Sequence, residues 1–467
     1  MSHSTGTGTR TWHASVLTRA TVGRRWFSAA FGAVAVLALL AAIGVAVPDY
    51  GVYALAAAVA LLITGATVYN PAAIPVLAMP ALVVVQRVGG ASTNLSFSDF
   101  ALFGAFWAAL LLGPRPWSRP MRSLLWLSAF YQVATLFTVI ANPYRANTVE
   151  WFHAWLSVGG ALVVGWAVGR SGHARLGVGL YLGACGILAA ATCVQGLTQL
   201  AQGNTAAVFL SWPYGMHKNF VGDVLGIAAL VVYARPPWLG LSRKVAYPAF
   251  WLFVLAIAAT QSRQAIVGLG LLVLVVALRR GQGVRHTKLV LLAIIPAGFF
   301  VVQVLVDQLS SGNQFNSAYQ RISWYQDALV VWNLNQWFGA GLRWWYSGRT
   351  PYSFQPPNAE LEVLSSAGTV GLVGFLVLML GALVVVWRIS PAYGTLAFAV
   401  IASRLVQGQL DLFWVSVQTS VPFVIAGVCV GALARHEAAP PQPDDGAERE
   451  GPPVATDERA SASPVAA

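Results

Sequence analysis

Two carboxylates and an amide stand just before a long apolar run. Asn358, Glu360 and Glu362 lie in the stretch PPNAELEVLSSAGTVG, residues 356–371. A carboxylate within reach of a hydroxyl group can accept its proton as a general base. Residues two apart on a helix are separated by about 200° around its axis, so Glu360 and Glu362 cannot both point into one cleft. Alternatively, the two negative charges favour the helix N-terminus by about 0.3–1 kcal/mol.

Four cations lie where they could bind a phosphate group. Arg87 follows one apolar run, Lys218 begins another, and Arg263 lies in the tight turn of ATQSRQAIVG between two more. Arg321 belongs to a polar segment further along the chain. A guanidinium binds phosphate through two parallel hydrogen bonds, and an ammonium acts as a point charge. The alternatives are snorkelling of Lys218 and an ion pair between Arg87 and Asp99.

A histidine directly precedes one of these cations. His217 and Lys218 are neighbours in the stretch SWPYGMHKNFVGD. An imidazole titrates near neutral pH, so His217 could transfer a proton or donate a hydrogen bond. Capping of the following helix is the competing role. A further arginine near the same membrane boundary, Arg404, has Asp411 as a candidate ion-pair partner.

These side chains belong to a chain that is too apolar for a soluble domain. Hydrophobic residues make up 57% of its 467 residues, charged residues only 9%, and the mean hydropathy is +0.65. Apolar runs of about 20 residues are long enough to cross a bilayer. The sequence therefore predicts an all-α polytopic membrane protein with about 12–14 transmembrane helices. The predicted spans are 27–47, 50–68, 71–86, 99–112, 122–141, 153–169, 176–198, 218–234, 245–260, 264–279, 288–306, 362–387, 391–403 and 414–434.

The distribution of Lys and Arg predicts the orientation. Most of these 28 residues fall in the N-terminal segment, in alternate loops after it, and in the C-terminal tail. Positive charge is enriched on the cytoplasmic side, so both termini are predicted to be cytoplasmic. The acidic residues before the tail then all fall on the outer side, which makes the extracytoplasmic face the candidate active face. The net charge of +12 follows from this topology and gives no reason to expect a nucleic acid partner.

The chain is predicted to have three regions. Residues 1–26 form a basic cytoplasmic N-terminus, and residues 27–434 form the transmembrane domain. Residues 435–467, rich in Pro, Ala, Asp and Glu, are expected to be a disordered cytoplasmic tail. The transmembrane domain contains one large outer loop, 307–357.

That outer loop contains a segment with helical periodicity. Residues 317–332 have apolar side chains along one helical face, which predicts an amphipathic helix on the membrane surface. The Trp residues of the loop suit a membrane interface or a surface that binds sugar rings. The residues of the apolar face are Ile322, Tyr325, Leu329 and Trp332.

No metal site and no cofactor are predicted. The sequence has no H-E-x-x-H motif, no Cys/His cluster, and no D-x-D in an outer loop. The three cysteines, Cys185, Cys193 and Cys429, lie in apolar runs and are expected to be small core residues.

Four short stretches resemble the O-antigen ligase and O-antigen polymerase superfamily of bacterial membrane glycosyltransferases. They are HKNFVG (217–222), SRQAIVG (262–268), RISWYQDAL (321–329) leading to FGAG, and PNAELEVLSSAGTVG (357–371). By layout the resemblance covers residues 80–430, including the large outer loop before the last spans.

One family motif is His-Asn, nine residues, then Gly-x-x-Gly. Asn358, Gly368 and Gly371 match it, whereas Pro357 occupies the position of the His. In the family that His is associated with catalysis. We therefore expect another group to accept the proton, and Glu360, Glu362 and His217 are the candidates. Close packing of helices is the simpler explanation for the two glycines.

The resemblance implies a function in surface polysaccharide biosynthesis at the bacterial cytoplasmic membrane. Family members transfer a glycan from undecaprenyl pyrophosphate to a glycan, lipid or polymer acceptor on the outer face. Arg263 and Arg321 match arginines of the family pattern as pyrophosphate-binding residues, while Lys218 and Arg87 are chosen by position. Ligase and polymerase activity remain equally open.

Three alternatives remain. A transporter or flippase of lipid-linked glycans would need ionisable residues deep within its spans, and the predicted spans contain few. A glycosyltransferase of the polyprenyl-phosphate-sugar type would have acidic residues in a sizeable first outer loop, which here is only PDY around Asp49. The third is a family member that binds lipid-linked glycan without catalysis.

Overall fold

The computed structural model describes residues 67–87, 95–281 and 317–439, with isolated positions at 64–65, 298, 302–303 and 306. Within these residues the elements are helices, and no β-strand is formed. The predicted all-α fold of a polytopic membrane protein is confirmed.

Most consecutive helices are joined by short connections, and the longest described ones are 202–217 before α8 and 335–358 before α13. Three brief segments interrupt the α-helices: a π-helical turn, η1, and two 3₁₀ turns, η2 and η3. In chain order the elements are α2 (Ala73–Ala81), α3 (Phe97–Leu112), α4 (Arg119–Ala141), α5 (Arg145–Trp155), η1 (Leu156–Gly160), α6 (Ala161–Arg170), α7 (Ala174–Ala201), α8 (Lys218–Ala234), η2 (Pro237–Leu239), α9 (Arg243–Thr260), α10 (Arg263–Leu278), α12 (Ser317–Leu334), η3 (Trp344–Tyr346), α13 (Ala359–Arg388), α14 (Pro391–Gly408) and α15 (Ser416–Glu437).

Six helices of the described part are long and apolar enough to cross a membrane, counting the continuous run Arg145–Arg170 as one. The others are α4, α7, α9, α13 and α15. Predicted spans 27–47 and 288–306, and most of 50–68, lie outside the described residues or at isolated positions, so the total of about 12–14 stays a prediction. Three helices differ from the predicted spans by five residues or more: α2 ends before 86, the run Arg145–Arg170 begins before 153, and α14 extends past 403 to Gly408.

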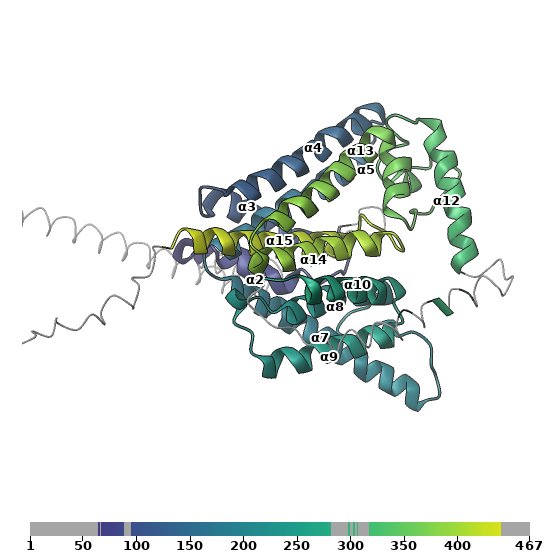
Figure 1. Ribbon diagram of the computed structural model, residues 1–467. Coiled ribbons are helices and arrows are strands. Elements are labelled where there is room, and N and C mark those ends of the chain that lie inside the picture. The colour runs from purple at the N-terminus through teal and green to yellow at the C-terminus, as the bar shows by residue number, and fades with distance from the viewer. Residues whose placement is uncertain are drawn as a thin grey trace, which may run out of the picture.

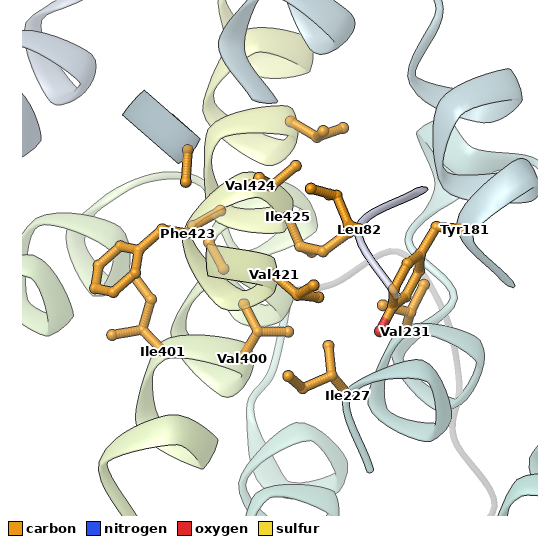
Figure 2. Close-up of a cluster of buried hydrophobic side chains, with 14 of the residues drawn as sticks. Leu82, Tyr181, Ile227, Val231, Val400, Ile401, Val421, Phe423, Val424 and Ile425 are labelled. Carbon is orange, nitrogen blue, oxygen red and sulfur yellow. The ribbon is translucent and has the colours of Figure 1, made fainter. Parts of the chain in front are cut away.

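Figure 1 shows most of the helices running roughly parallel, with α12 lying across one end of the bundle. The C-terminal end of α15 lies at the opposite end. The described part of the predicted outer loop is therefore a layer over one end of the helices. Figure 2 shows the apolar core between them, where Val421 of α15 lies near Val400 of α14 and Ile227 of α8, and Ile425 of α15 lies near Leu82.

Helices α6 and α15 pack with their backbones in contact. Each has two glycines spaced four residues apart, and an added Cβ at any of the four would collide with main-chain atoms of the partner helix. Lipid tails are as apolar as side chains, so helices in a membrane associate through close van der Waals packing, which small residues permit. The glycines are Gly165 and Gly169 on α6, and Gly427 and Gly431 on α15.

Replacement of one of these glycines by a large residue should separate the two helices. We expect Gly427→Leu to lower the unfolding free energy by at least about 1–3 kcal/mol, because the side chain has no space against α6. Thermal unfolding of the purified protein in detergent measures the loss. The control is Gly183→Leu on α7, where an added Cβ meets nothing within 4 Å. Equal melting temperatures for the two variants would contradict this packing.

Candidate functional site

Helix α13 is broken at a glycine. Gly368 has φ 67° and ψ −168°, a conformation that is open almost only to glycine. The break leaves the carbonyls of Ser365 and Ser366 and the amides of Thr369 and Val370 without their usual helical partners. Unpaired main-chain groups are costly in a membrane unless the protein itself satisfies them. Close packing of helices, the simpler explanation considered for Gly368, does not account for this conformation.

Residues 336–341 of the outer loop fill the break. Two amides of the loop donate to the carbonyls of α13, and two amides of α13 donate to carbonyls of the loop. An added Cβ at Gly339 or Gly368 would collide with the opposite backbone, so both glycines are required for this close approach. The four hydrogen bonds are Ala340 N to Ser365 O (3.0 Å), Gly341 N to Ser366 O (2.9 Å), Thr369 N to Gln336 O (2.8 Å) and Val370 N to Trp337 O (3.2 Å).

Asn358 begins α13 as its N-cap. Its Oδ1 accepts from the amide of Leu361 at 3.0 Å, and its Nδ2 donates to Oε1 of Gln409 at 3.3 Å. The neighbouring Pro357 is buried, and its carbonyl accepts a hydrogen bond from the Tyr325 hydroxyl of α12 at 3.4 Å. Asn358 therefore has a complete structural role, because it caps the helix and holds the α14–α15 connection.

Glu360 lies half-buried beside this cap. One carboxylate oxygen, Oε1, accepts from Nε2 of Gln409 at 2.9 Å. The other oxygen, Oε2, is buried and has no hydrogen-bond partner among the described residues. A carboxylate oxygen buried without a donor retains its capacity to accept a proton or a hydrogen bond from a ligand.

Glu362 points elsewhere and is 1% exposed. It accepts from Nε2 of Gln355 at 2.7 Å and from the amide of Phe413 at 3.0 Å. It also lines a cavity of about 20 Å³ together with Glu150 and Arg343, which is room for about one water molecule. The two glutamates thus contact different residues, as their separation around the helix predicts.

The connection between α14 and α15 joins both glutamates to α10. Gln409 contacts Glu360, and the amide of Phe413 contacts Glu362. Between them, Oδ2 of Asp411 accepts from Nε2 of Gln264 at 3.0 Å. Gln264 directly follows Arg263, so this connection brings the start of α13 and the start of α10 into one site.

Three of the four predicted cations come together at this site. The positive charges of Arg263 and Arg321 both act on Lys218, and Arg321 also acts on Arg263. Each comes from a different helix: Lys218 begins α8, Arg263 begins α10, and Arg321 lies in the first turns of α12. We call Lys218, Arg263 and Arg321 the cation cluster.

His217 adjoins the cation cluster as the N-cap of α8. Its Nδ1 accepts from the amide of Asn219 at 3.3 Å, which leaves Nε2 as the nitrogen that bears the proton in the neutral ring. Burial lowers the pKa of His217 below its usual value, Asp411 raises it, and Lys218 lowers it. The imidazole is therefore neutral at pH 7, and the predicted capping role is also present.

Arg87, the fourth predicted cation, lies apart. It is exposed and forms an isolated antiparallel bridge with Ser96. Arg87 is not among the charges that act on Lys218 or Arg263. The expected ion pair with Asp99 is replaced by contacts of Asp99 with Ser96 and His153, at 2.7 and 3.1 Å.

A buried charge network under the loop was missed at the sequence level. The ring of His153 lies between Asp99 and Glu150, with both N···O distances 3.1 Å. Nε of Arg343, from the outer loop, lies 3.7 Å from the same Glu150 carboxylate. The network fixes the loop to α3 and α5. Glu150 and His153 are three residues apart, a spacing at which helical side chains meet, and this was the available signal.

The loop is fixed to the α4–α5 connection as well. The Tyr144 hydroxyl donates to the carbonyl of Leu342 at 2.9 Å, and the amide of Leu342 donates to Oδ1 of Asn147 at 2.9 Å. Burial raises the pKa of Tyr144, against the opposing effect of Arg349 and Arg343, so the hydroxyl keeps its proton.

Arg404 and Asp223 are two further buried charges, near the end of α14 and the start of α8. Both are fully buried within helices. Arg404 donates to the carbonyls of Leu412 and Phe413, not to Asp411, so the predicted ion pair is wrong. Asp223 accepts from Nε2 of Gln418 on α15 at 2.6 Å.

The predicted helix 317–332 is present as α12. Ala328 and Val331 are buried against the protein, and Trp324 stacks on Phe354 with ring centroids 5.4 Å apart. Ile322 and Leu329, from the predicted apolar face, are 45% and 40% exposed. The helix therefore has one side on the protein and an apolar side left open, and contact of that side with a membrane stays a prediction.

These features define a helical membrane protein with a polar site under a large loop at one end of the bundle. Residues 248–376 match the family model described as O-antigen ligase. The match supports the O-antigen ligase/polymerase superfamily, so the resemblance noted in the sequence is confirmed. The matched segment contains Arg263, Arg321, the two glutamates and the break in α13, but not Lys218. No curated protein matches the chain.

A side chain at the break should detach the loop. We expect Gly368→Ala to cost about 1–3 kcal/mol or more, because alanine disfavours this conformation and its Cβ meets the Trp337 backbone. Limited proteolysis in detergent should show faster cleavage between residues 335 and 357 than in the wild type. The control is Gly186→Ala on α7, where an added Cβ meets nothing within 4 Å. An unchanged cleavage rate in Gly368→Ala would refute this role of the glycine.

Proposed function

We propose that the protein transfers a glycan from undecaprenyl pyrophosphate to a hydroxyl of an acceptor, as an O-antigen ligase or polymerase. The observation that supports this most is the cation cluster, because three helices contribute one cation each to one place. The α14–α15 connection, which contacts both Glu360 and Gln264 of α10, links it to the start of α13. The family match supports ligase- or polymerase-type transfer in general terms. The Lys and Arg distribution favours the extracytoplasmic side for the site.

The cation cluster suits a pyrophosphate. Lys218, Arg263 and Arg321 repel one another, and a bound polyanion removes this repulsion. Guanidinium groups bind phosphate oxygens in pairs, and the ammonium adds a compact charge. As the sugar–oxygen bond breaks, negative charge grows on the leaving pyrophosphate, and fixed cations stabilise that charge most in the transition state. Arg87 is left out of this role because it lies apart from the cluster.

Glu360 is our choice for the general base. Its Oε2 accepts the proton of the acceptor hydroxyl while the hydroxyl oxygen forms a bond to the anomeric carbon of the donor sugar. The bond from that carbon to the pyrophosphate oxygen breaks, and undecaprenyl pyrophosphate leaves with the electron pair. Glu362 suits the role less, because both its oxygens already accept hydrogen bonds and its cavity has room for about one water molecule. Asn358 positions Glu360 through Gln409.

In this proposal Glu360 replaces the family His whose position Pro357 occupies. A proline has no proton-accepting side chain, and the carbonyl of Pro357 is bonded to Tyr325. His217 is the second candidate, since it is neutral at pH 7 and adjoins Lys218. No metal ion or cofactor is part of the proposed reaction.

A flippase of lipid-linked glycans is the alternative that one observation favours. Asp223 and Arg404 are fully buried in helices, and intramembrane ionisable residues often lie along transport paths. An assay for a new glycan product made by the purified protein distinguishes the two functions. A transferase forms such a product, whereas a flippase moves its substrate without changing any bond. A non-catalytic binder would do neither.

Loss of single cations should weaken both donor binding and transfer. We expect Arg263→Ala and Arg321→Ala to lower the transfer rate about 100-fold or more. Transfer is measured with purified protein and a lipid-linked oligosaccharide, and binding with undecaprenyl pyrophosphate compared with undecaprenol. The control is Arg145→Ala, which removes an exposed arginine at the start of α5. If the wild type and all three variants prefer undecaprenyl pyrophosphate over undecaprenol equally, the cation cluster is excluded as the binding site of the pyrophosphate.

The base can be identified by substitution. Glu360→Gln should lower transfer about 100-fold or more while undecaprenyl pyrophosphate still binds, because the amide cannot accept a proton. Asp327→Asn, which neutralises another acid of the outer loop, serves as the control. Full activity of Glu360→Gln would remove Glu360 from the mechanism.

A pH profile tests His217. The pKa of His217 is lowered, so the ring gains its proton only below its ordinary value of about 6.5. If His217 were the base, transfer would fall on acidification below that value, and His217→Asn would abolish transfer. With Glu360 as the base, His217→Asn keeps most of the activity at pH 7. The stability of the fold depends on pH in the same direction, because the folded protein favours the neutral ring of His217. The contribution of His217 to the unfolding free energy is complete above about pH 6.5 and decreases on acidification.

A further inference from the structure

A second polar pocket lies at the end of the bundle opposite α12. Its volume is about 480 Å³, and it is open to the surroundings. The turn between α6 and α7, η2, the start of α14 and the end of α15 surround it. No acidic residue is among its lining residues, and its polar side chains are Arg175, Trp238, Tyr393, Arg435 and His436.

Arg175 is a cation at the N-terminal end of a helix. It is the second residue of α7, and the first turn of a helix disfavours positive charge. This turn has no acidic residue, and His173 provides no side-chain cap for its amides. Nε of Arg175 donates to the carbonyl of Leu239 at 3.0 Å, which orients the guanidinium toward Gly240. The uncapped amides and the guanidinium therefore offer donors at the same pocket.

Arg435 supplies a second guanidinium. It lies in the last turn of α15, where a cation offsets the helix dipole, so its presence alone has an ordinary explanation. Its position is more informative. A Cβ at Gly172, which has φ +88°, would collide with its guanidinium, so Arg435 lies directly over the turn before α7. Two arginines from separate helices thus line one cavity.

One wall of the pocket is a row of rings. The rings of Trp238 and Tyr393 stack with centroids 6.1 Å apart and planes within 2°. The ring of His436 also stacks on Tyr393, with centroids 6.1 Å apart. Nε1 of Trp238 donates to the carbonyl of Ala392 at 3.1 Å, which fixes the wall. Trp and Tyr favour the membrane interface, where an apolar face meets a polar headgroup. The acidic Glu437 follows His436 but does not line the cavity.

We propose that this pocket binds the phosphate of an anionic phospholipid headgroup. The guanidinium groups of Arg175 and Arg435 bind the phosphate oxygens, and the ring wall contacts the glycerol portion of the lipid. Basic pockets between transmembrane helices on the cytoplasmic side are suited to anionic headgroups. The positive-inside distribution predicts this end of the bundle to be cytoplasmic. The site is separate from the cation cluster and does not depend on glycan transfer.

Native mass spectrometry of the full-length protein in detergent tests the proposal. The probes are phosphatidylglycerol, phosphatidylcholine and inorganic phosphate, each added separately. Each lipid is also added in competition with inorganic phosphate. We expect retention of phosphatidylglycerol in preference to phosphatidylcholine. Arg175→Gln and Arg435→Gln should each weaken retention about tenfold, the effect of one lost charged hydrogen bond. Arg388→Gln, at an exposed arginine that does not line the pocket, is the control.

Each result decides the proposal. Equal retention by wild type and both variants overturns it, as does displacement of the lipid by inorganic phosphate with no lipid preference, which would identify a free phosphate site. Residues 440–467 contain six acidic residues that could occupy the pocket: Asp444, Asp445, Glu448, Glu450, Asp457 and Glu458. Retention that occurs only after their removal also overturns the proposal for the full chain. Melting temperatures of the variants in the same detergent check that each is folded.

Discussion

Main-chain hydrogen bonding at the break in α13 is the constraint on which the site depends. A membrane offers no water to unpaired amides and carbonyls, so a helix can be interrupted there only where other protein atoms replace the lost bonds. The segment 336–341 supplies them, and it reaches the break because Gly339 and Gly368 have no side chains. Both glutamates lie in the first part of α13, before the break, so the same contact that holds the loop also orients this part of the helix.

The site is assembled from ends of helices, where charge is less costly than in their middles. Lys218, Arg263 and Arg321 lie in the first turns of their helices, and Asn358 caps a fourth. The Asp99–His153–Glu150–Arg343 network has a different character, because its members are buried and paired. The lost hydration of two buried charges offsets much of their mutual attraction, and removal of one partner is strongly destabilising. The network thus fixes where the loop lies rather than adding stability.

Periodicity and charge predicted the helices from 97 to 278 and from 359 to 437 to within a few residues at most ends, because long apolar runs have few alternative structures in lipid. Arg263 and Arg321 were selected by motif and Lys218 by position, and they do meet. The failures involve pairing across the fold. Arg404 and Arg87 each had an acidic residue nearby in sequence. Arg404 instead donates to a main-chain carbonyl, and Asp99, the expected partner of Arg87, contacts a histidine from another helix. Sequence also gave no sign that Gly368 breaks a helix, since that depends on a backbone thirty residues away.

The outer loop is fastened on both sides of an exposed stretch, in which Arg349 donates to Oδ1 of Asn142 at 3.2 Å. Trp344 donates to Ser365 before it, and Gln355 donates to Glu362 after it, while most of residues 346–353 are exposed or half-buried. Lengthening a loop between fixed ends costs little, about 0.6 kcal/mol for each doubling. Apart from Arg349, this stretch can therefore change in length and composition without moving the glutamates or the cation cluster. Evolution could alter the surface presented to an incoming acceptor there while the machinery beneath stays the same.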